Sequence, residues 1–443
     1  MDRAMDKASG AKPACDLNLA SCTLVDLLSG RFVPDSLVSI RDGFVVGVND
    51  GLEAARTIDL GGRFLAPGLV DAHVHIESSL LCPAEYAKVV LPRGTTTVVA
   101  DPHEIVNVMG YDGMRFMLAA SEGLPLDIRF MVPSCVPATE FDTAGSTLYA
   151  SDMYPFLRDG RVLGLGEVMN YPGILARDPR LMDKIALFRS AGKPVDGHAP
   201  GLRGAGLSAY IRAGIGSDHE CTRPEEALEK LSKGMYIMLR EGSTARDLEN
   251  LLPAVTTANA SRFMICSDDR HSNDLRDEGH MDHALRLLLR GGVDRIDALR
   301  IASSNPAQWF GMGELGAVAP GKRADFVVFS SFEDFTAEMV FASGRLVAEN
   351  GRLVSEIPNR PPALRDSVNI KWLEAEDFRI PYRGGKIRVI ETQKDSIRTS
   401  CSLEDPKVES GFCVSDTQRD IIKIFVVERH TGSGRIGKGF VRG

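Results

Sequence analysis

The chain has 443 residues, 44% of them hydrophobic and 25% charged, which is enough to bury at least one large core and to support two domains. Its formal net charge of −8 is spread along the chain without a basic stripe that would follow phosphates, so a nucleic-acid polymer is excluded as a partner. Eight scattered cysteines without a C-x-x-C pair exclude a disulfide framework and a structural zinc site. No run of 18 apolar residues occurs, and the first residues lack an apolar signal region, so we expect a cytoplasmic protein without a membrane partner.

The first predicted element is a β-rich segment at residues 16–66. Short apolar runs such as SLVSIRDGFVVGV alternate there with Gly, Asp and Asn turn residues, a pattern typical of small antiparallel sheets. The same character returns in residues 310–358, within GKRADFVVFSSFEDFTAEMVFASGRLVAENGRL. We therefore expect the two segments to form one composite β-sandwich module.

Between these flanks, residues 67–309 alternate apolar strands with helical stretches. Strand-like runs such as TTTVVADP, DIRFMVPS and FMICSDD recur about eight times. Strands that alternate with helices predict a parallel sheet, and this number of units favours an α/β fold closed into a TIM-like (β/α)8 barrel. After about residue 358 the chain becomes polar and mixed, and we expect residues 359–443 to be the start of a truncated C-terminal region.

The stretch LAPGLVDAHVHIESS, residues 65–79, places two histidines one residue apart directly after a Pro-Gly turn. Alternate side chains of a strand share one face, so His73 and His75 point the same way while Val74 points away. At the C-terminal end of a barrel strand, where functional groups collect, two converging imidazoles form two arms of a divalent-metal site. An H-x-H pair alone is a weak signal, because strand histidines often only satisfy local hydrogen bonds.

Further strand ends strengthen the metal hypothesis. Each of four later apolar runs stops at a potential metal ligand: Glu167 in GLGEVM, His198 in DGHAP, His219 in GSDHE and Asp268 in ICSDD. Because functional groups of a barrel collect at the carboxyl ends of its strands, this repeated coincidence predicts one shared site.

The order H-x-H, Glu, His, His, Asp resembles the amidohydrolase superfamily, whose barrel holds one or two divalent metals. The resemblance covers about residues 17–360. Many members bridge two metals with a carbamylated lysine on the fourth strand, whereas this chain has Glu167 there, and a carboxylate bridges without modification. The motifs PGLVDAHVHIESS, GTTTVVADPHEI, GLGEVMNYPG, DGHAPG, SDHE and CSDDRH are similar to blocks of the adenine deaminase family. That family continues into a C-terminal domain, which we expect this chain to lack.

The resemblance implies the hydrolytic deamination of adenine to hypoxanthine and ammonia by a metal-bridged hydroxide, as in purine salvage. Metal binding lowers the pKa of water towards about 7, which provides such a nucleophile at neutral pH. The implied ligands are His73 and His75 for a first ion, His198 and His219 for a second, Glu167 as the bridge and Asp268 at the first ion. Asp268 would also move protons to the ring nitrogen and the leaving amine. The ligand types suit two Mn2+ or Fe2+ ions, which the resemblance favours, and also Zn2+.

Neighbouring polar residues have a functional and a structural interpretation. His103 in VVADPHEI would join Asp268 and Glu167 as a catalytic group, or cap the next helix. Glu77 in HIESS would orient a metal-bound histidine or contact substrate, or cap a helix. His271 would bind the purine or lie on the surface.

Three other features favour structural interpretations. His280 and His283 share a helix face and would bind an accessory ion, although a solvated helix start is the simpler interpretation. Cys266 lacks a partner base and is expected in the core. GSGRIGKG at 432–439 lacks the P-loop pattern and is expected to be a flexible connection.

Two rival functions stay open at this point. A cyclic-amide or ureide hydrolase would use the same metals but open its substrate at a carbonyl, whereas a deaminase releases ammonia without ring opening. A catalytically impaired truncated homologue, serving as an assembly subunit, would typically have lost a metal ligand, and all six are present. We expect adenine as the small-molecule substrate and a homo-oligomer, a dimer, as the assembly.

Overall fold

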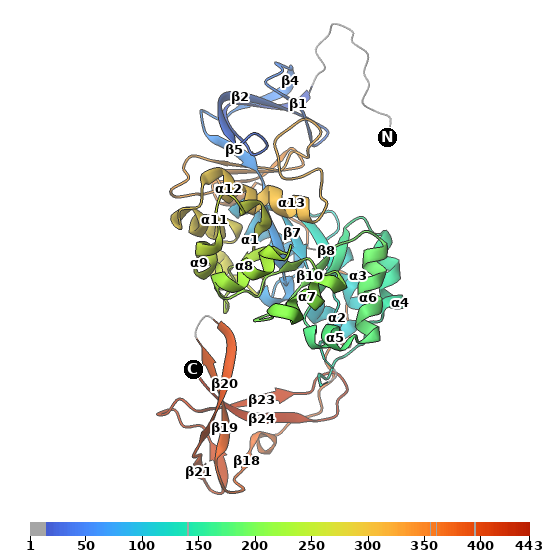
Figure 1. The fold of residues 1–443 in the computed structure, drawn as a ribbon. Coiled ribbons are helices and arrows are strands. Elements are labelled where there is room, and N and C mark those ends of the chain that lie inside the picture. The colour runs from blue at the N-terminus through green and yellow to red at the C-terminus, as the bar shows by residue number, and fades with distance from the viewer. Residues whose placement is uncertain (1–14, 140, 355, 360, 394–395) are drawn as a thin grey trace.

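The computed structural model describes residues 15–139, 141–354, 356–359, 361–393 and 396–443. Figure 1 shows a barrel in the middle, with the N-terminal strands at one end of it and the C-terminal strands at the other. Within the described residues, no helix has both the length and the apolar character needed to cross a lipid bilayer.

Eight parallel strands form the barrel: β6 (Leu69–Val74), β7 (Thr95–Ala100), β8 (Asp127–Val132), β9 (Val162–Val168), β10 (Val195–Gly197), β11 (Ser217–Asp218), β12 (Tyr236–Arg240) and β13 (Phe263–Cys266). Strands β6 to β10 pair in one sheet and β11 to β13 in another. Backbone hydrogen bonds join the two sheets on both sides, because Gly216 N donates to Val195 O at 3.1 Å and Asp268 N donates to His73 O at 2.9 Å. The predicted TIM-like barrel is therefore confirmed.

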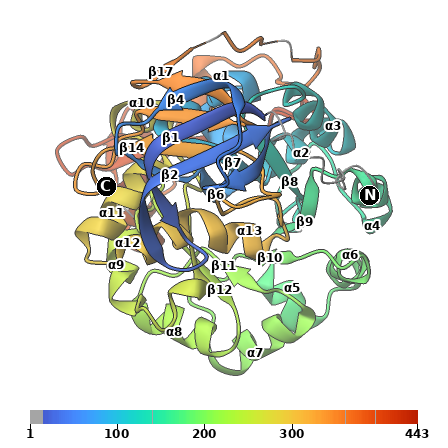
Figure 2. The ribbon, with the colours of Figure 1, turned by 90° about the horizontal axis from the view of Figure 1, so that it is seen from above.

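Helices surround these strands, and Figure 2 shows α3, α6, α7, α8, α9, α11 and α12 around the circumference. The helices are α1 (Pro83–Val90), α2 (His103–Met109), α3 (Tyr111–Ala120), α4 (Ala150–Met153), α5 (Tyr171–Ala176), α6 (Pro179–Ser190), α7 (Gly204–Ala213), α8 (Pro224–Ser232), α9 (Leu248–Leu251), α10 (Ser272–Asp277), α11 (Met281–Arg290), α12 (Arg295–Leu299) and α13 (Asn305–Trp309). Helix α11 illustrates their pattern, because it buries Met281, Ala284, Leu285 and Leu288 on one face at helical spacing.

The two β-rich flanks of the barrel form one nine-stranded sheet. Its strands are β1 (Cys15–Asp26), β2 (Arg31–Arg41), β3 (Phe44–Val48), β4 (Ala54–Asp59), β5 (Phe64–Pro67), β14 (Phe326–Phe329), β15 (Met339–Ala342), β16 (Arg345–Glu349) and β17 (Arg352–Leu353). Antiparallel pairing of β5 with β14 joins the flanks, with Leu65 opposite Val328 and Pro67 opposite Phe326. This confirms the β-rich module that the two flanks were expected to build together.

The C-terminal region contains two small sheets, with the strand orders β18-β22-β21 and β20-β19-β24-β23. The strands are β18 (Ile380–Pro381), β19 (Ile387–Gln393), β20 (Ser396–Glu404), β21 (Lys407–Glu409), β22 (Phe412–Val414), β23 (Ile422–Val427) and β24 (Ile436–Arg442). Val389, Cys413, Ile421 and Phe440 form a core of their own. The flexible connection expected at 432–439 is wrong from residue 436 onward, because β24 starts there and pairs with β23.

Candidate active site

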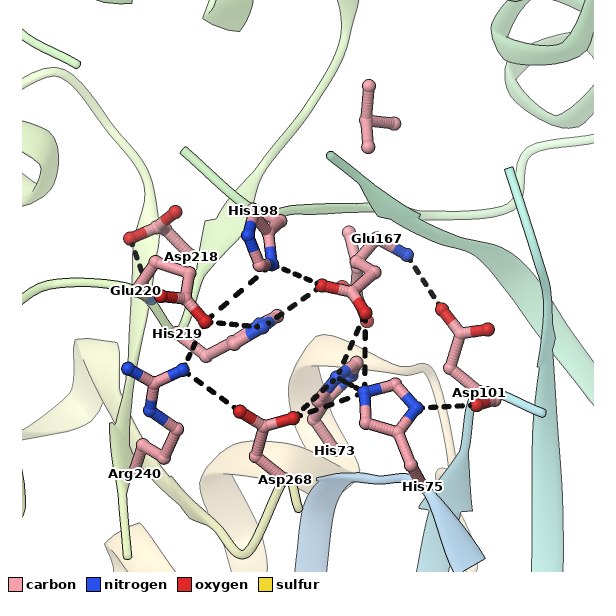
Figure 3. Close-up of polar contacts among 12 residues, drawn as sticks. His73, His75, Asp101, Glu167, His198, Asp218, His219, Glu220, Arg240 and Asp268 are labelled. Carbon is pink, nitrogen blue, oxygen red and sulfur yellow. Dashed lines mark hydrogen bonds and ion pairs between the residues drawn. The ribbon is translucent and has the colours of Figure 1, made fainter. Parts of the chain in front are cut away.

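The six expected ligands converge at the C-terminal ends of the barrel strands (Figure 3). His73 is in β6 and Glu167 is in β9, while His75, His198 and His219 directly follow a strand and Asp268 lies two residues beyond the end of β13. Five of the six residues are buried, and His198 keeps 24% of its side chain exposed. The cluster is thus a largely enclosed set of four imidazoles and two carboxyl groups.

The first group forms around the end of β6. The Nε2 atoms of His73 and His75 lie 3.1 Å apart, and Asp268 Oδ1 lies 3.1 Å from His75 Nε2. His75 Nδ1 lies 2.7 Å from the carbonyl oxygen of Asp101. Because a carbonyl oxygen only accepts, Nδ1 must donate, so Nε2 is the nitrogen of His75 that faces the site and would bind a cation there.

The backbone of Asp268 brings its carboxylate to this group. Asp268 has a left-handed conformation with φ of 53°, and its N–H donates to the carbonyl oxygen of His73. Its own carbonyl oxygen accepts the N–H of His75 at 3.3 Å. These two bonds close the barrel between β13 and β6 and hold the carboxylate beside the two histidines.

Glu167 connects this first group to a second group, which consists of His198 and His219. Its Oε1 lies 3.2 Å from His75 Nε2, while its Oε2 lies 2.5 Å from His198 Nδ1 and 3.2 Å from His219 Nε2. Asp101 holds the backbone of Glu167 in place, because its Oδ2 accepts the N–H of Glu167 at 2.9 Å. The geometry is that of one carboxylate with one oxygen toward each pair of imidazoles.

The donor atoms fit divalent cations. His73, His75 and Asp268 offer ligand atoms within 4.8 Å of one another, and so do His198, His219 and Glu220. Among the described residues, His219 Nε2 and Glu220 Oε2 are buried without a hydrogen-bond partner. Buried polar atoms are rarely left unpaired, and a bound cation would pair these. Imidazole and carboxylate are ligands that Mn2+, Fe2+ and Zn2+ accept.

The cluster also keeps its carboxyl groups ionised. Burial alone would raise the pKa of Glu167, but His198 and His103 hold it well below its usual range. Burial acts the same way on Asp268, whose pKa is nevertheless held well below its usual range by His75. Both groups are therefore carboxylates at neutral pH, the form in which they bind cations and accept protons.

Arg240, at the end of β12, is a part of the site that the sequence reasoning missed. Its Nη1 donates to Asp268 Oδ2 at 2.9 Å and to a carboxylate oxygen of Glu220, and its Nη2 donates to Asp247 Oδ2 at 2.8 Å. Burial alone would lower the pKa of Arg240, but Glu220 and Asp268 raise it well above its usual value. The signal was present, because an arginine ends the apolar run YIMLRE as the expected ligands end theirs.

We expect Arg240→Met to lower the free energy of unfolding by about 3–5 kcal/mol, because it leaves three buried carboxylates without their cation. Denaturant unfolding of chelator-treated protein measures the change. The control Arg246→Met removes a pair with Glu278, with 28% of the Arg246 side chain exposed, and should cost at most about 1 kcal/mol. Equal stability of the two variants would contradict the structural importance of Arg240.

The other candidate residues lie in different places. His103 starts α2, and its Nδ1 lies 3.1 Å from Glu167 Oε1, so the structure brings it into the cluster. Glu77 Oε1 accepts the N–H of Ile105 at 3.3 Å in the first turn of the same helix, which matches the capping interpretation. Burial beside Glu104 raises the pKa of Glu77 to about 8. His271 is exposed just before α10.

Both interpretations of His280 are wrong. The residue is buried, with Nε2 2.9 Å from Asp71 Oδ2 and Nδ1 2.8 Å from Thr95 Oγ1. It therefore belongs to a hydrogen-bond network beneath the site and is neither solvated nor free to bind an ion. Cys266 is fully buried in a hydrophobic cluster, which confirms the expected core role.

Comparison with protein families agrees with this geometry. The model of the amidohydrolase family matches residues 64–347, and the model of the adenine deaminase C-terminal domain matches residues 396–443. The expectation that the chain lacks this C-terminal domain is therefore corrected, since its last described segment is similar to that domain.

Individual proteins are similar to this chain over most or all of its length. The adenine deaminase of Desulfatibacillum aliphaticivorans is 47% identical over 443 residues, which is 100% of this chain and 77% of that protein. The adenine deaminase of Kosmotoga olearia is 44% identical over 440 residues, covering 98% of this chain and 76% of that protein. A solved L-hydantoinase (dihydropyrimidinase) from Arthrobacter aurescens shares the fold with a TM-score of 0.54 at 16% identity, over 77% of this chain and 98% of that one. The chain belongs to the amidohydrolase family and, within it, to the adenine deaminases.

Proposed function

We propose that this hydrolase of C–N bonds converts adenine and water to hypoxanthine and ammonia at the six-residue cluster. The observation that carries the proposal is the placement of Glu167, with one oxygen toward each pair of imidazoles. The similarity to adenine deaminases supports adenine as the substrate.

The same cluster supports a division of ligands between two divalent ions. His73, His75 and Asp268 would hold one ion, His198 and His219 would hold the other, and Glu167 would lie between them. When bound, such ions lower the pKa of a water molecule towards about 7 and so supply a nucleophile at neutral pH. We propose Mn2+ or Fe2+, in line with the family resemblance, and the donor types also suit Zn2+.

Asp268 is the proposed proton carrier. Its Oδ2 is held by Arg240, while its Oδ1 faces the imidazoles of the first group. Because Asp268 is ionised, it can accept a proton as the water oxygen attacks the amino-bearing ring carbon. It passes this proton to the ring nitrogen, then accepts the second proton of the attacking oxygen and passes it to the amine, which leaves as ammonia. One carboxyl group thus meets both proton requirements of the reaction.

His103 and Glu167 are the other proposed catalytic groups. His103 Nδ1 contacts Glu167 Oε1, and 21% of the His103 side chain remains exposed. His103 also lines a cavity of about 710 Å³, a volume typical of small-molecule sites. His103 therefore contacts both the ligand cluster and this cavity, in which we propose that the purine binds. Substrate contacts of Glu77 and His271 stay predictions.

The direct test is an assay of ammonia release from adenine after loading the protein with Mn2+ or Fe2+. Cytosine, guanine and dihydroorotate serve as comparison substrates. We expect ammonia from adenine with the absorbance change of hypoxanthine formation. Ring opening of dihydroorotate without turnover of adenine would replace the proposal by a cyclic-amide hydrolase.

A further inference from the structure

The cavity of about 710 Å³ has two walls from distant parts of the chain. His103, Glu104 and Met169 line it from the barrel, and residues 426–430 line it from the C-terminal strands. In Figure 1 the β23–β24 hairpin extends below the barrel, beneath α2 and α5. His103, which also contacts Glu167, links the cavity to the ligand cluster.

One carboxylate holds the turn between β23 and β24 in shape. Glu428 accepts the N–H of His430 at 2.6 Å and of Thr431 at 2.9 Å, and the hydroxyls of Thr431 at 2.7 Å and Ser433 at 2.6 Å. The hydroxyls of Ser433 and Thr431 help to hold the pKa of Glu428 well below its usual range. The turn is therefore organised by its own side chains before any ligand binds.

His430 of this turn has a buried ring nitrogen, Nδ1, without a hydrogen-bond partner among the described residues. The residue also lines the cavity. The imidazole packs over the barrel loop at Gly145, because a Cβ added to Gly145 would lie 2.9 Å from Nδ1. Gly145 N in turn donates to the carbonyl oxygen of Asn107, a residue of α2 that also lines the cavity.

We propose that the turn at residues 428–435 forms the outer wall of the substrate pocket and that His430 contacts the bound purine. This inference rests on the proposed function, because it takes adenine as the occupant. A neutral imidazole has one donor and one acceptor nitrogen, which suits the mixed donor and acceptor edge of adenine, and its ring stacks on aromatic bases. Such a contact acts on substrate and transition state alike, so it changes KM more than kcat.

The experiment compares the full chain, His430→Ala, His430→Gln and the control Ile424→Ala, all loaded with Mn2+. Ile424 is exposed on β23 of the same hairpin, and it is not among the described residues that line the cavity. We expect His430→Ala to raise KM for adenine about tenfold with kcat within about threefold, and His430→Gln to recover part of the loss. Calorimetric titration with hypoxanthine should show a parallel loss of affinity, while Ile424→Ala matches the unmodified chain.

The outcomes separate this inference from the proposed function. If the unmodified chain deaminates adenine and His430→Ala keeps both KM and hypoxanthine affinity, the inference alone is overturned. If His430→Ala instead binds less metal, or if its kcat falls by as large a factor as its KM rises, the residue has a structural role and the proposed contact is wrong. A metal-loaded unmodified chain that releases no ammonia from adenine overturns the proposed function, and the inference falls with it.

Discussion

Replacing Asp268 by asparagine is expected to lower kcat for adenine by at least about 100-fold. The amide keeps the size of the side chain but cannot carry a proton between water, ring and leaving amine. It also weakens two contacts, with His75 Nε2 at 3.1 Å and with Arg240 at 2.9 Å. Initial rates of ammonia release from the metal-loaded protein measure the effect.

Metal content must be measured in the same samples, because Asp268 is also a proposed ligand. If Asp268→Asn keeps its metal but loses activity, the loss is due to proton transfer. If the variant also loses metal, the loss of activity reflects metal binding and proton transfer together. The control Asp277→Asn changes an exposed carboxyl in α10, nine positions later in the chain, and should keep kcat. A kcat near that of the unmodified chain in Asp268→Asn would remove this residue from the mechanism.

The convergence of the candidate ligands was predictable from sequence because a barrel has a simple geometric rule. Each parallel strand ends at the same face, so His73, Glu167 and His219 are neighbours although nearly 150 residues separate the first from the last. Alternation along a strand then predicts that His75 shares the face of His73. Neither step needs knowledge of strand register.

Contacts that depend on register and packing were not predictable. Arg240 pairs with Asp268 only because β12 lies beside β13, with Arg240 opposite Cys266. His280 contacts Asp71, which lies 209 positions away in the sequence. The i, i+3 spacing of His280 and His283 carries no information about that partner. The two histidines near the start of one helix therefore suggested a solvated surface where the fold has a buried network.

The C-terminal turn shows a related failure of local reasoning. Glycines at 432–439 favour flexibility when the segment is considered alone. Pairing of Val427 with Ile436 and the hydrogen bonds to Glu428 give it one defined conformation. A glycine-rich composition permits many conformations, and the partners that select one of them are visible only in the folded chain.

Glu167 is the residue whose loss should disturb the proposed metal sites most, because it is the only one of the six candidate ligands with one oxygen toward each imidazole pair. In Glu167→Gln one oxygen becomes an amide nitrogen, which is not a cation ligand, and the negative charge beside His198 and His219 is lost. We expect bound divalent metal to fall from about two ions per chain to one or fewer, and kcat for adenine to fall at least about 100-fold.

Metal analysis of protein passed through a desalting column after Mn2+ loading measures this loss directly. His73→Ala and His198→Ala are the companion variants, since each removes a ligand from one group only and should leave more metal than Glu167→Gln. The control Glu229→Gln changes a carboxylate of α8 that pairs with Arg203 at 2.7 Å, and it should keep both metal and activity. If Glu167→Gln retains two ions per chain, the carboxylate does not bridge, because an amide can offer a cation only one oxygen whereas each oxygen of Glu167 faces a different imidazole pair.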